Sequence, residues 1–256
     1  MSQPPLDSGG FLPSPTLTTP ASPSPSISST TSSLPHPRSR ALKPGSAKED
    51  AVRRYVEGRL LHISRRYAKK YQPPEGMEGE VVGYVRMGDV CKDLGDVVDV
   101  LWISGTPSLQ IPYLLNIALA LTTYMTAFPP APIAMFALLR KLDRVFTSLL
   151  KGEDSETGEF LPGFEGGRSR GMSRTDMVRV KSLVESTRVL VVEVMSKEPE
   201  DEGEDESEPD GEGGESNGWM GDDEEMEMDV ARVYEGTIVM LNEFGFGFVA
   251  GEGPSS

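Results

Sequence analysis

The sequence predicts an all-α protein: a bundle of four to six helices with a disordered N-terminal leader and an acidic C-terminal linker. Apolar residues recur every three or four positions in several stretches, which is typical of helices that bury one face. The chain also carries no charged side chain between Asp99 and Arg140, although its formal net charge is −15. Such a stretch must be shielded from water by a helical core, a membrane or a partner protein.

Composition divides the chain into four predicted parts. Residues 1–45 are rich in Pro, Ser and Thr and have few large apolar side chains, so we expect a disordered leader. Residues 46–197 form the predicted helical bundle. Residues 198–229 hold 17 acidic residues and no Lys or Arg, which predicts a disordered acidic linker. Residues 230–256 are expected to form a short helix and a flexible end. The acidity therefore belongs to the linker, and residues 51–197 carry a net charge of +3.

The first predicted helix is marked by an N-terminal capping pattern, and the second by a regular row of apolar residues. Ser46 and Glu49 form a capping-box pattern, which predicts a helix that ends before Pro73. Its apolar face comprises Val52, Val56, Leu60, Ile63, Tyr67 and Tyr71, and Arg and Lys occupy the other faces. The second helix has a coiled-coil spacing through Met87, Val90, Leu94, Val97 and Leu101. Gly105 is the expected C-terminal cap of this second helix.

The remaining helices follow at regular intervals. A third should begin at Thr106-Pro107 and run to about Phe128. The fourth follows Pro132, ends at Gly152, and has an apolar seam of Phe136, Leu139, Leu142, Phe146 and Leu149. A second capping box at Ser173 opens the fifth, whose seam is Met177, Val180, Val184, Thr187, Val191 and Val194. A sixth helix is permitted by the spacing of Val230, Val233, Thr237, Leu241 and Phe244.

Residues 109–128 are long enough to span a membrane, but their composition favours a helix buried in the bundle. Pro112 lies near the start of this segment, and Gln110 and Asn116 lie within it. Its flanks also lack the charge asymmetry of a membrane span. Membrane association through residues 109–128 stays an alternative function.

The junction between the second and third helices is the predicted partner-binding site. An aromatic and proline-rich surface of this kind can anchor an interface. The candidate residues are Trp102, Pro107, Leu109, Pro112 and Tyr113. A buried corner of the core explains the same residues, so both interpretations stay open.

No catalytic or metal-binding motif is present. Cys91 is the only cysteine, and the only histidines are His36 and His62, so a Cys/His zinc site cannot be built. The stretch from Gly163 to Gly171 resembles a phosphate-binding loop but lacks the Gly-Lys-Ser/Thr ending. We therefore expect a protein that is not an enzyme and needs no cofactor.

The flanks have candidate regulatory features. Ser14, Thr19, Ser22 and Ser24 each precede a proline and are candidate sites for proline-directed kinases. The acidic linker 198–229 could compete with DNA for basic surfaces of a partner, or it could be a passive spacer. The basic first helix leaves a third function open, a nucleic-acid-binding accessory factor in repair or recombination.

Three blocks of sequence resemble a fungal protein family. They are Tyr55-Val-Glu-Gly-Arg-Leu-Leu-His-Ile-Ser-Arg-Arg-Tyr67, Asp99-Val-Leu-Trp-Ile-Ser-Gly-Thr-Pro-Ser-Leu-Gln-Ile-Pro-Tyr113, and Leu142-Asp-Arg-Val-Phe-Thr-Ser-Leu-Leu150 with Leu161-Pro-Gly-Phe-Glu165. The chain resembles the eleventh, accessory subunit of the general transcription factor TFIIH over roughly residues 50–197. No binding residue of that family can be carried over by position.

The resemblance implies a nuclear, non-enzymatic adaptor for transcription initiation and DNA repair. Its expected partner is the XPB-type translocase of TFIIH, which such a subunit binds and helps to release. Contact with nucleic acid would be weak or indirect, and no membrane is implied.

Overall fold

The computed structural model describes residues 34–72, 81–164, 172–196 and 220–246, which all belong to one compact unit. These residues confirm the all-α prediction, because the described ranges contain seven helices and, outside them, a single isolated β-bridge between Glu153 and Phe160. The helices are α1 (Ala47–Ala68), α2 (Met87–Ser104), α3 (Pro107–Met125), α4 (Pro132–Lys151), α5 (Arg174–Met195), α6 (Met220–Ala231) and α7 (Glu235–Glu243).

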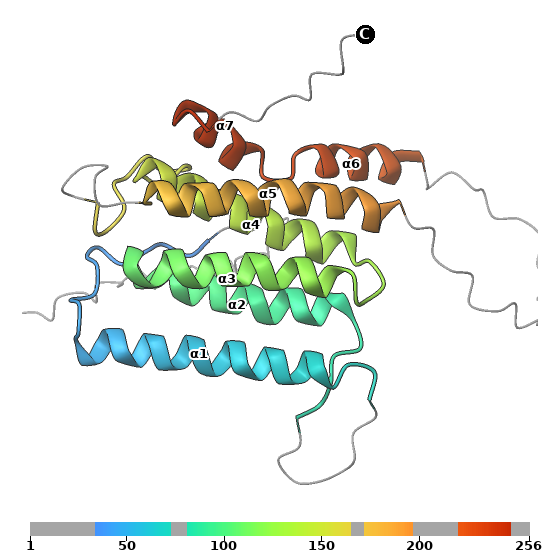
Figure 1. Cartoon of the computed structure of the whole chain (residues 1–256), viewed down its shortest axis with the longest axis horizontal. Coiled ribbons are helices and arrows are strands. Elements are labelled where there is room, and N and C mark those ends of the chain that lie inside the picture. The colour runs from blue at the N-terminus through green and yellow to red at the C-terminus, as the bar shows by residue number, and fades with distance from the viewer. Residues whose placement is uncertain (1–33, 73–80, 165–171, 197–219, 247–256) are drawn as a thin grey trace, which may run out of the picture. The chain divides into compact units, whose positions relative to one another are not determined.

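The helices lie lengthwise, so the connections between them gather at two ends (Figure 1). Helix α2 packs against α1, α3 and α4, while α3 also packs against α5. The α2–α3 junction and the α4–α5 loop lie at one end of the bundle. The α1–α2 and α3–α4 connections lie at the other end (Figure 1).

The predicted seams of α2, α4 and α5 lie in the core. All five seam residues of α2 are buried, and so are all five of α4. In α5 the seam is buried from Val180 onward, and Met177 packs against it from the edge. In α1 only Val56 and Ile63 of the predicted apolar face are fully buried, and Tyr71 lies beyond the end of the helix and is exposed. The predicted caps are also present: Gly105 and Gly152 adopt left-handed conformations at the ends of α2 and α4, with φ of 53° and 80°.

Helix α3 is buried on most sides, as its composition predicts. Its residues Leu109, Leu114, Ile117 and Leu121 have no exposed surface. Pro112 lies inside α3, beyond its first turn, so its missing N–H removes one helical hydrogen bond. In the described ranges, no helix combines the length and the apolar composition that a membrane crossing requires.

The N-terminal boundary differs from the prediction. Residues 34–45, assigned to the leader, lie against the helices, with Leu34 and Leu42 buried. Burial of these two apolar side chains stabilises the contact of this stretch with the helices. The candidate phosphorylation sites Ser14, Thr19, Ser22 and Ser24 lie outside the described residues.

The C-terminal part also differs, because the predicted single helix is two. Helix α6 starts within the predicted acidic linker, at Met220, and α7 follows a break at Arg232–Tyr234. Tyr234 has a φ of 57° and is fully buried against Phe146 of α4, which turns the chain out of helical geometry. Residues 198–219 of the linker lie outside the described residues.

Asp143 of α4 fixes the start of α7. Its carboxylate accepts hydrogen bonds from the backbone N–H of Gly236 at 3.1 Å and of Thr237 at 2.7 Å. The Thr237 hydroxyl donates to the same carboxylate at 2.6 Å. The residue before α7, Tyr234, makes no side-chain cap of its own. A residue from another helix therefore caps α7, which explains why the local sequence gives a weak helix signal.

Candidate docking site

The five predicted partner-binding residues do not form one surface. Trp102 and Leu109 are fully buried in the core, and Pro107 is half-buried. Only Pro112 is well exposed, while Tyr113 is half-buried and its hydroxyl donates to Glu57 of α1. For Trp102 and Leu109 the structure therefore favours the buried-corner interpretation.

A segment of the predicted leader covers this corner. We call residues 34–42 the strap. The strap is tied to the α2–α3 junction by two backbone hydrogen bonds, from Arg38 N–H to the Ile103 carbonyl at 3.3 Å and from Leu42 N–H to Thr106 Oγ1 at 2.9 Å. Thr106 Oγ1 donates in turn to the Ser104 carbonyl at 2.8 Å. The hydroxyl of Thr106 therefore links the strap to the end of α2.

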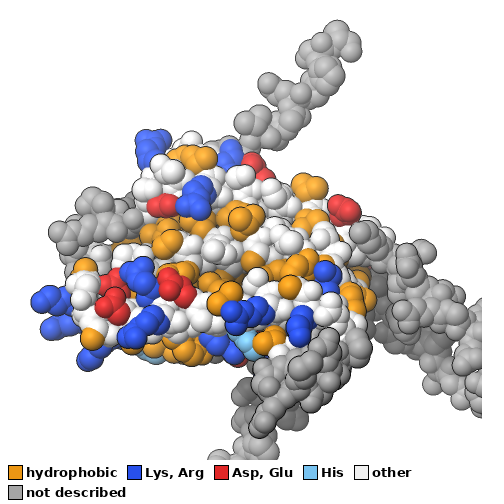
Figure 2. All heavy atoms as spheres, turned by 60° about the horizontal axis from the view of Figure 1, so that its bottom comes forward, with side chains coloured by type: hydrophobic (Ala, Val, Ile, Leu, Met, Phe, Trp, Pro, Cys, Tyr) orange, Lys and Arg blue, Asp and Glu red, His pale blue; other side chains and the backbone are white. Residues whose placement is uncertain are grey.

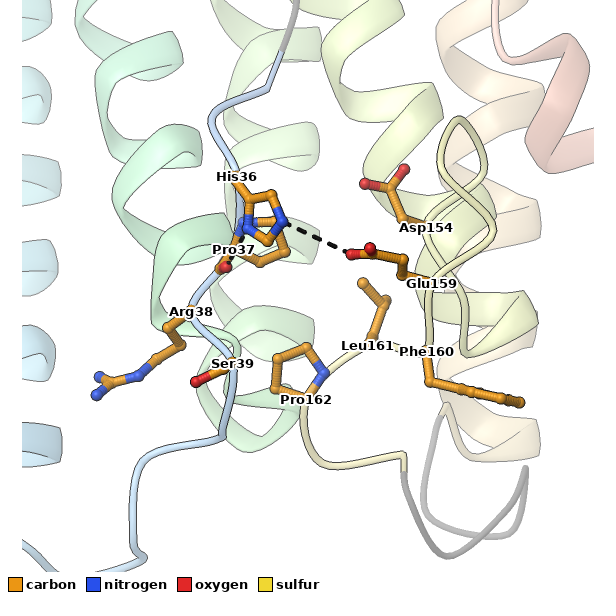
Figure 3. A pocket seen from close by; sticks show the side chains of 9 residues that line it. All are labelled: His36, Pro37, Arg38, Ser39, Asp154, Glu159, Phe160, Leu161 and Pro162. Atoms are coloured by element: carbon orange, nitrogen blue, oxygen red, sulfur yellow. Dashed lines mark hydrogen bonds and ion pairs between the residues drawn. The ribbon is translucent and has the colours of Figure 1, made fainter.

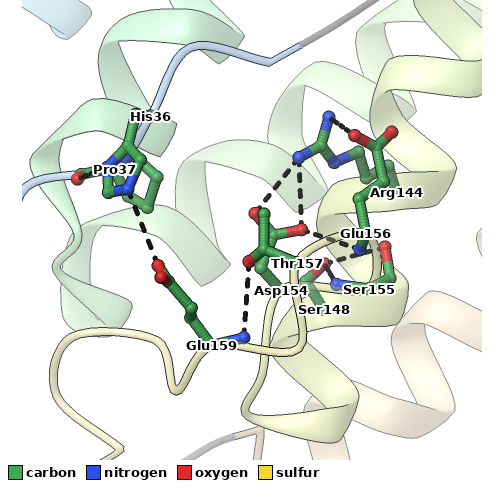
Figure 4. A network of polar contacts seen from close by, with 9 residues as sticks. All are labelled: His36, Pro37, Arg144, Ser148, Asp154, Ser155, Glu156, Thr157 and Glu159. Carbon is green, nitrogen blue, oxygen red and sulfur yellow. Dashed lines mark hydrogen bonds and ion pairs between the residues drawn. The ribbon is translucent and has the colours of Figure 1, made fainter.

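The α4–α5 loop (residues 152–164) closes the other side of the corner. Asp154 is almost fully buried and pairs with Arg144 of α4 at 3.1 Å (Figure 4). The N–H of Ser155 donates to Ser148 Oγ at 3.0 Å, and Leu161 N–H donates to the Gly152 carbonyl at 3.0 Å. These contacts fold the loop back on the end of α4.

Two glycines allow the three segments to approach closely. A Cβ on Gly105 would lie 3.0 Å from Pro162 and 3.1 Å from Arg38 of the strap. A Cβ on Gly163 would lie 2.9 Å from Pro107. Both glycines also have positive φ, so a larger residue there would be strained. We call the assembly of strap, α2–α3 junction (residues 102–107) and α4–α5 loop the clasp.

A cavity of about 300 Å³ opens between the strap and the loop (Figure 3). Phe160 stands at its edge with 72% of its surface exposed, while its neighbour Leu161 is buried. The lining residues are His36, Pro37, Arg38, Ser39, Asp154, Glu159, Phe160, Leu161 and Pro162. An exposed aromatic ring beside a preformed cavity is the kind of feature that anchors a protein partner.

The acidic groups that line the cavity already have partners within the chain. His36 and Glu159 approach to 3.6 Å, but both side chains are mostly exposed, and the Asp154 carboxylate is already held by Arg144. An ion pair this exposed contributes little free energy. Within the described ranges, no cluster of His, Cys, Asp and Glu has the arrangement of a metal site. The feature of the clasp that is open to a partner is therefore the exposed ring of Phe160.

Three of the arginines of α1 are engaged in internal ion pairs. Asp93 of α2 binds Arg66 at 2.7 Å and Arg59 at 3.1 Å, and it accepts a hydrogen bond from the Tyr84 hydroxyl at 2.6 Å. Arg53 pairs with Glu49 at 3.2 Å. Figure 2 shows Lys and Arg side chains together with Asp and Glu on the face that comes forward. The charge available to nucleic-acid phosphates is smaller than the sequence indicates.

Sequence reasoning found the corner but missed the strap and Phe160. The strap lies in a Pro- and Ser-rich stretch, where Leu34 and Leu42 are the only signals of packing. Phe160 follows an acidic and Gly-containing loop and belongs to no helical seam. The block Leu161-Pro-Gly-Phe164, which is part of the family resemblance, packs in the clasp.

A family match covers most of the described structure. The family described as subunit 11 of the general transcription factor TFIIH matches residues 83–242. Neither the curated proteins nor the solved structures that were compared with the chain gave a match.

The matched range refines the resemblance found in the sequence. It begins after α1 and continues through the acidic segment to α7, so the C-terminal helices belong to the family domain and α1 lies outside it. Two parts of the clasp, the α2–α3 junction and the α4–α5 loop, lie within the matched range, and the strap lies before it. The match covers more than half of the chain, and the chain belongs to the family of subunit 11 of the general transcription factor TFIIH.

Proposed function

We propose that this chain is a non-enzymatic nuclear subunit of TFIIH that binds the XPB-type translocase through the clasp and helps to release it from the complex. Family membership makes the chain a TFIIH component with protein partners in that complex. The docking site rests on one observation: Phe160 is exposed beside a cavity on a loop that is otherwise held by buried contacts.

The frame of the clasp supports this choice of site. Because Asp154, Leu161 and Phe164 fix the loop, Phe160 loses little conformational freedom on binding. Truncating an aromatic anchor at the centre of an interface typically costs about 2–4 kcal/mol, which is roughly 30- to 1,000-fold in affinity.

Binding to purified XPB-type translocase tests the site. We expect Phe160→Ala to weaken binding at least tenfold without changing the melting temperature. Val189→Ala is the matched control, because Val189 is an equally exposed apolar residue on α5. The proposal is wrong if the wild-type chain does not bind the translocase, or if Phe160→Ala binds like the wild type.

Release is measured separately. Immobilised TFIIH is incubated with the chain, and the translocase that leaves the complex is quantified. We expect the wild-type chain to increase release and Phe160→Ala to lose this effect. Equal release with and without the chain contradicts the second half of the proposal.

Two alternative functions, membrane association and nucleic-acid binding, are tested by cell fractionation and by binding experiments. A nuclear subunit is expected in soluble nuclear extract, whereas association through residues 109–128 predicts a carbonate-resistant membrane pellet. A nucleic-acid-binding factor predicts DNA affinity that falls steeply with salt. A role in DNA repair is part of the proposal, because the resemblance implies it for TFIIH.

A further inference from the structure

A second apolar surface lies at the end of the bundle opposite the clasp. Tyr71, Val82, Val85 and Ile133 expose 53%, 51%, 60% and 84% of their surface there. Pro129 and Pro130 are also exposed. We call these six residues the end surface. They come from the end of α1, the segment before α2, and the α3–α4 connection with the start of α4, which meet at one end of the bundle (Figure 1).

Backbone hydrogen bonds hold the end surface in place. Tyr84 N–H donates to the Arg66 carbonyl at 3.2 Å, and the Tyr84 carbonyl accepts from Tyr71 N–H at 3.0 Å. Gly83 lies so close to the Lys69 carbonyl that no other residue would fit there. The segment between Val82 and Val85 is therefore fixed across the end of α1.

The α3–α4 side is joined to the same frame. The Tyr71 hydroxyl donates to the Ala127 carbonyl at 2.9 Å, and the Tyr71 and Phe128 rings are 5.5 Å apart. A Cβ on Gly88 would lie 3.9 Å from the Cβ of Ala134, so the first turns of α2 and α4 are adjacent. Ile133 is therefore held near the start of α2.

The exposed valines are not needed for internal packing. The same segments already bury Tyr84 and Phe128, which anchor them to the core. Apolar side chains that are fixed in water and face outward mark a docking surface. Because the backbone is already ordered, a partner loses little entropy in covering them.

Charge indicates the kind of partner. Near the end surface, the described residues include Arg65, Lys69, Lys70 and Arg86. The described acidic residues there are Asp89, which pairs with Arg86 at 3.8 Å, and Asp93, which is held by Arg66 and Arg59. Basic groups beside an apolar patch complement a segment that carries apolar side chains with carboxylates at its edge. A nucleic-acid backbone would leave the valines and Ile133 uncovered, so a protein partner fits better.

We propose that the end surface is a second docking site, which binds an apolar segment with acidic edges on a TFIIH subunit other than the translocase. The inference rests on the family membership and goes beyond the proposed translocase contact. Helix α3 extends from the clasp to this end, and its 19 residues span about 28 Å. The chain would then bridge two subunits, one at each end of the bundle.

The experiment uses purified TFIIH that lacks the translocase, and the translocase alone, as separate binding targets. The double variant Val85→Asp and Ile133→Asp places carboxylates against the acidic edge of the partner. Both positions are exposed, so the melting temperature should stay unchanged. We expect at least a tenfold loss of binding to the translocase-free complex and unchanged binding to the translocase.

The controls separate this proposal from the first one. Phe160→Ala should show the opposite pattern, and Val189→Asp, an exposed change on α5, should affect neither target. A photo-crosslinking amino acid at position 133 should attach to an acidic and apolar segment of one TFIIH subunit. The proposal is overturned if the wild-type chain does not bind the translocase-free complex, if the double variant binds it normally, or if the crosslink forms within this chain's own acidic segment.

Discussion

Removing the Asp143 carboxylate should release α7 from the bundle. In Asp143→Ala the N–H groups of Gly236 and Thr237 lose their acceptor, and the Thr237 hydroxyl keeps only the more distant Asp143 backbone carbonyl at 3.3 Å. The Thr237 side chain is fully buried, so water cannot easily replace the lost hydrogen bond. The contact joins positions that are 94 residues apart, so no neighbour in sequence can substitute for it.

The expected cost can be worked from these contacts. Loss of an N-terminal cap costs about 0.5–2 kcal/mol. Loss of a hydrogen bond to a charged group adds about 1.5–3 kcal/mol, since the hydroxyl stays buried. The two effects share one carboxylate and are not additive, so we expect Asp143→Ala to lower the free energy of unfolding by roughly 2–4 kcal/mol.

Urea unfolding and hydrogen exchange measure the effect. The amides of residues 237–241 should lose protection, while those of α2 keep it. Asp229→Asn is the matched control, because Asp229 also joins the C-terminal helices to α4, through an exposed pair with Arg140 at 2.9 Å. That pair should contribute less than about 1 kcal/mol. A change below about 0.5 kcal/mol in Asp143→Ala, with protection of α7 intact, would refute the reasoning.

Three further predictions concern α2. Leu94→Asp puts a charge where no surface is exposed and should destabilise the protein by about 4 kcal/mol in urea unfolding; a change below about 1 kcal/mol would contradict this. Burial opposes ionisation of Asp93, but the Tyr84 hydrogen bond and the charges of Arg66 and Arg59 outweigh it and lower the pKa of this carboxyl. The stabilisation that ionised Asp93 gives the fold is thus complete above the unfolded pKa of about 3.9 and is lost as the pH falls through the lower folded pKa. Asp93→Asn should therefore lower the free energy of unfolding by about 3 kcal/mol at pH 7, and it should reduce the dependence of that free energy on pH under acidic conditions. Burial raises the pKa of the Cys91 thiol to about 12, so a thiol reagent should modify it only at the rate of unfolding.

The helices were predictable because their signals are local. The seam from Met87 to Leu101 and the glycine caps at Gly105 and Gly152 follow from spacing and conformation within one helix. Helix propensity and capping act over a few residues, so the sequence shows them directly. The same reasoning placed the corner around Trp102, although it could not decide whether that corner faces a partner or the core.

The strap and the break that separates α6 from α7 were not predictable for the opposite reason. Leu42 reaches Thr106 across 64 positions, and Thr237 reaches Asp143 across 94. Each contact depends on where other helices lie, which no local pattern encodes. Tyr234 shows the same limit, because its left-handed conformation is stabilised by burial against Phe146 and interrupts a spacing that would otherwise continue as one helix.

The uncharged run that dominates the sequence has two physical explanations. The inward faces of α3 and α4 supply the core, which accounts for residues such as Leu114 and Leu142. The outward row of α3 (Pro112, Asn116, Leu119 and Thr123) is exposed and still carries no charge. Folding alone does not require this, because charged side chains are tolerated on an exposed face. A partner that reaches from the clasp toward the end surface could cover this row without removing a charge from water, and so without the cost of that desolvation.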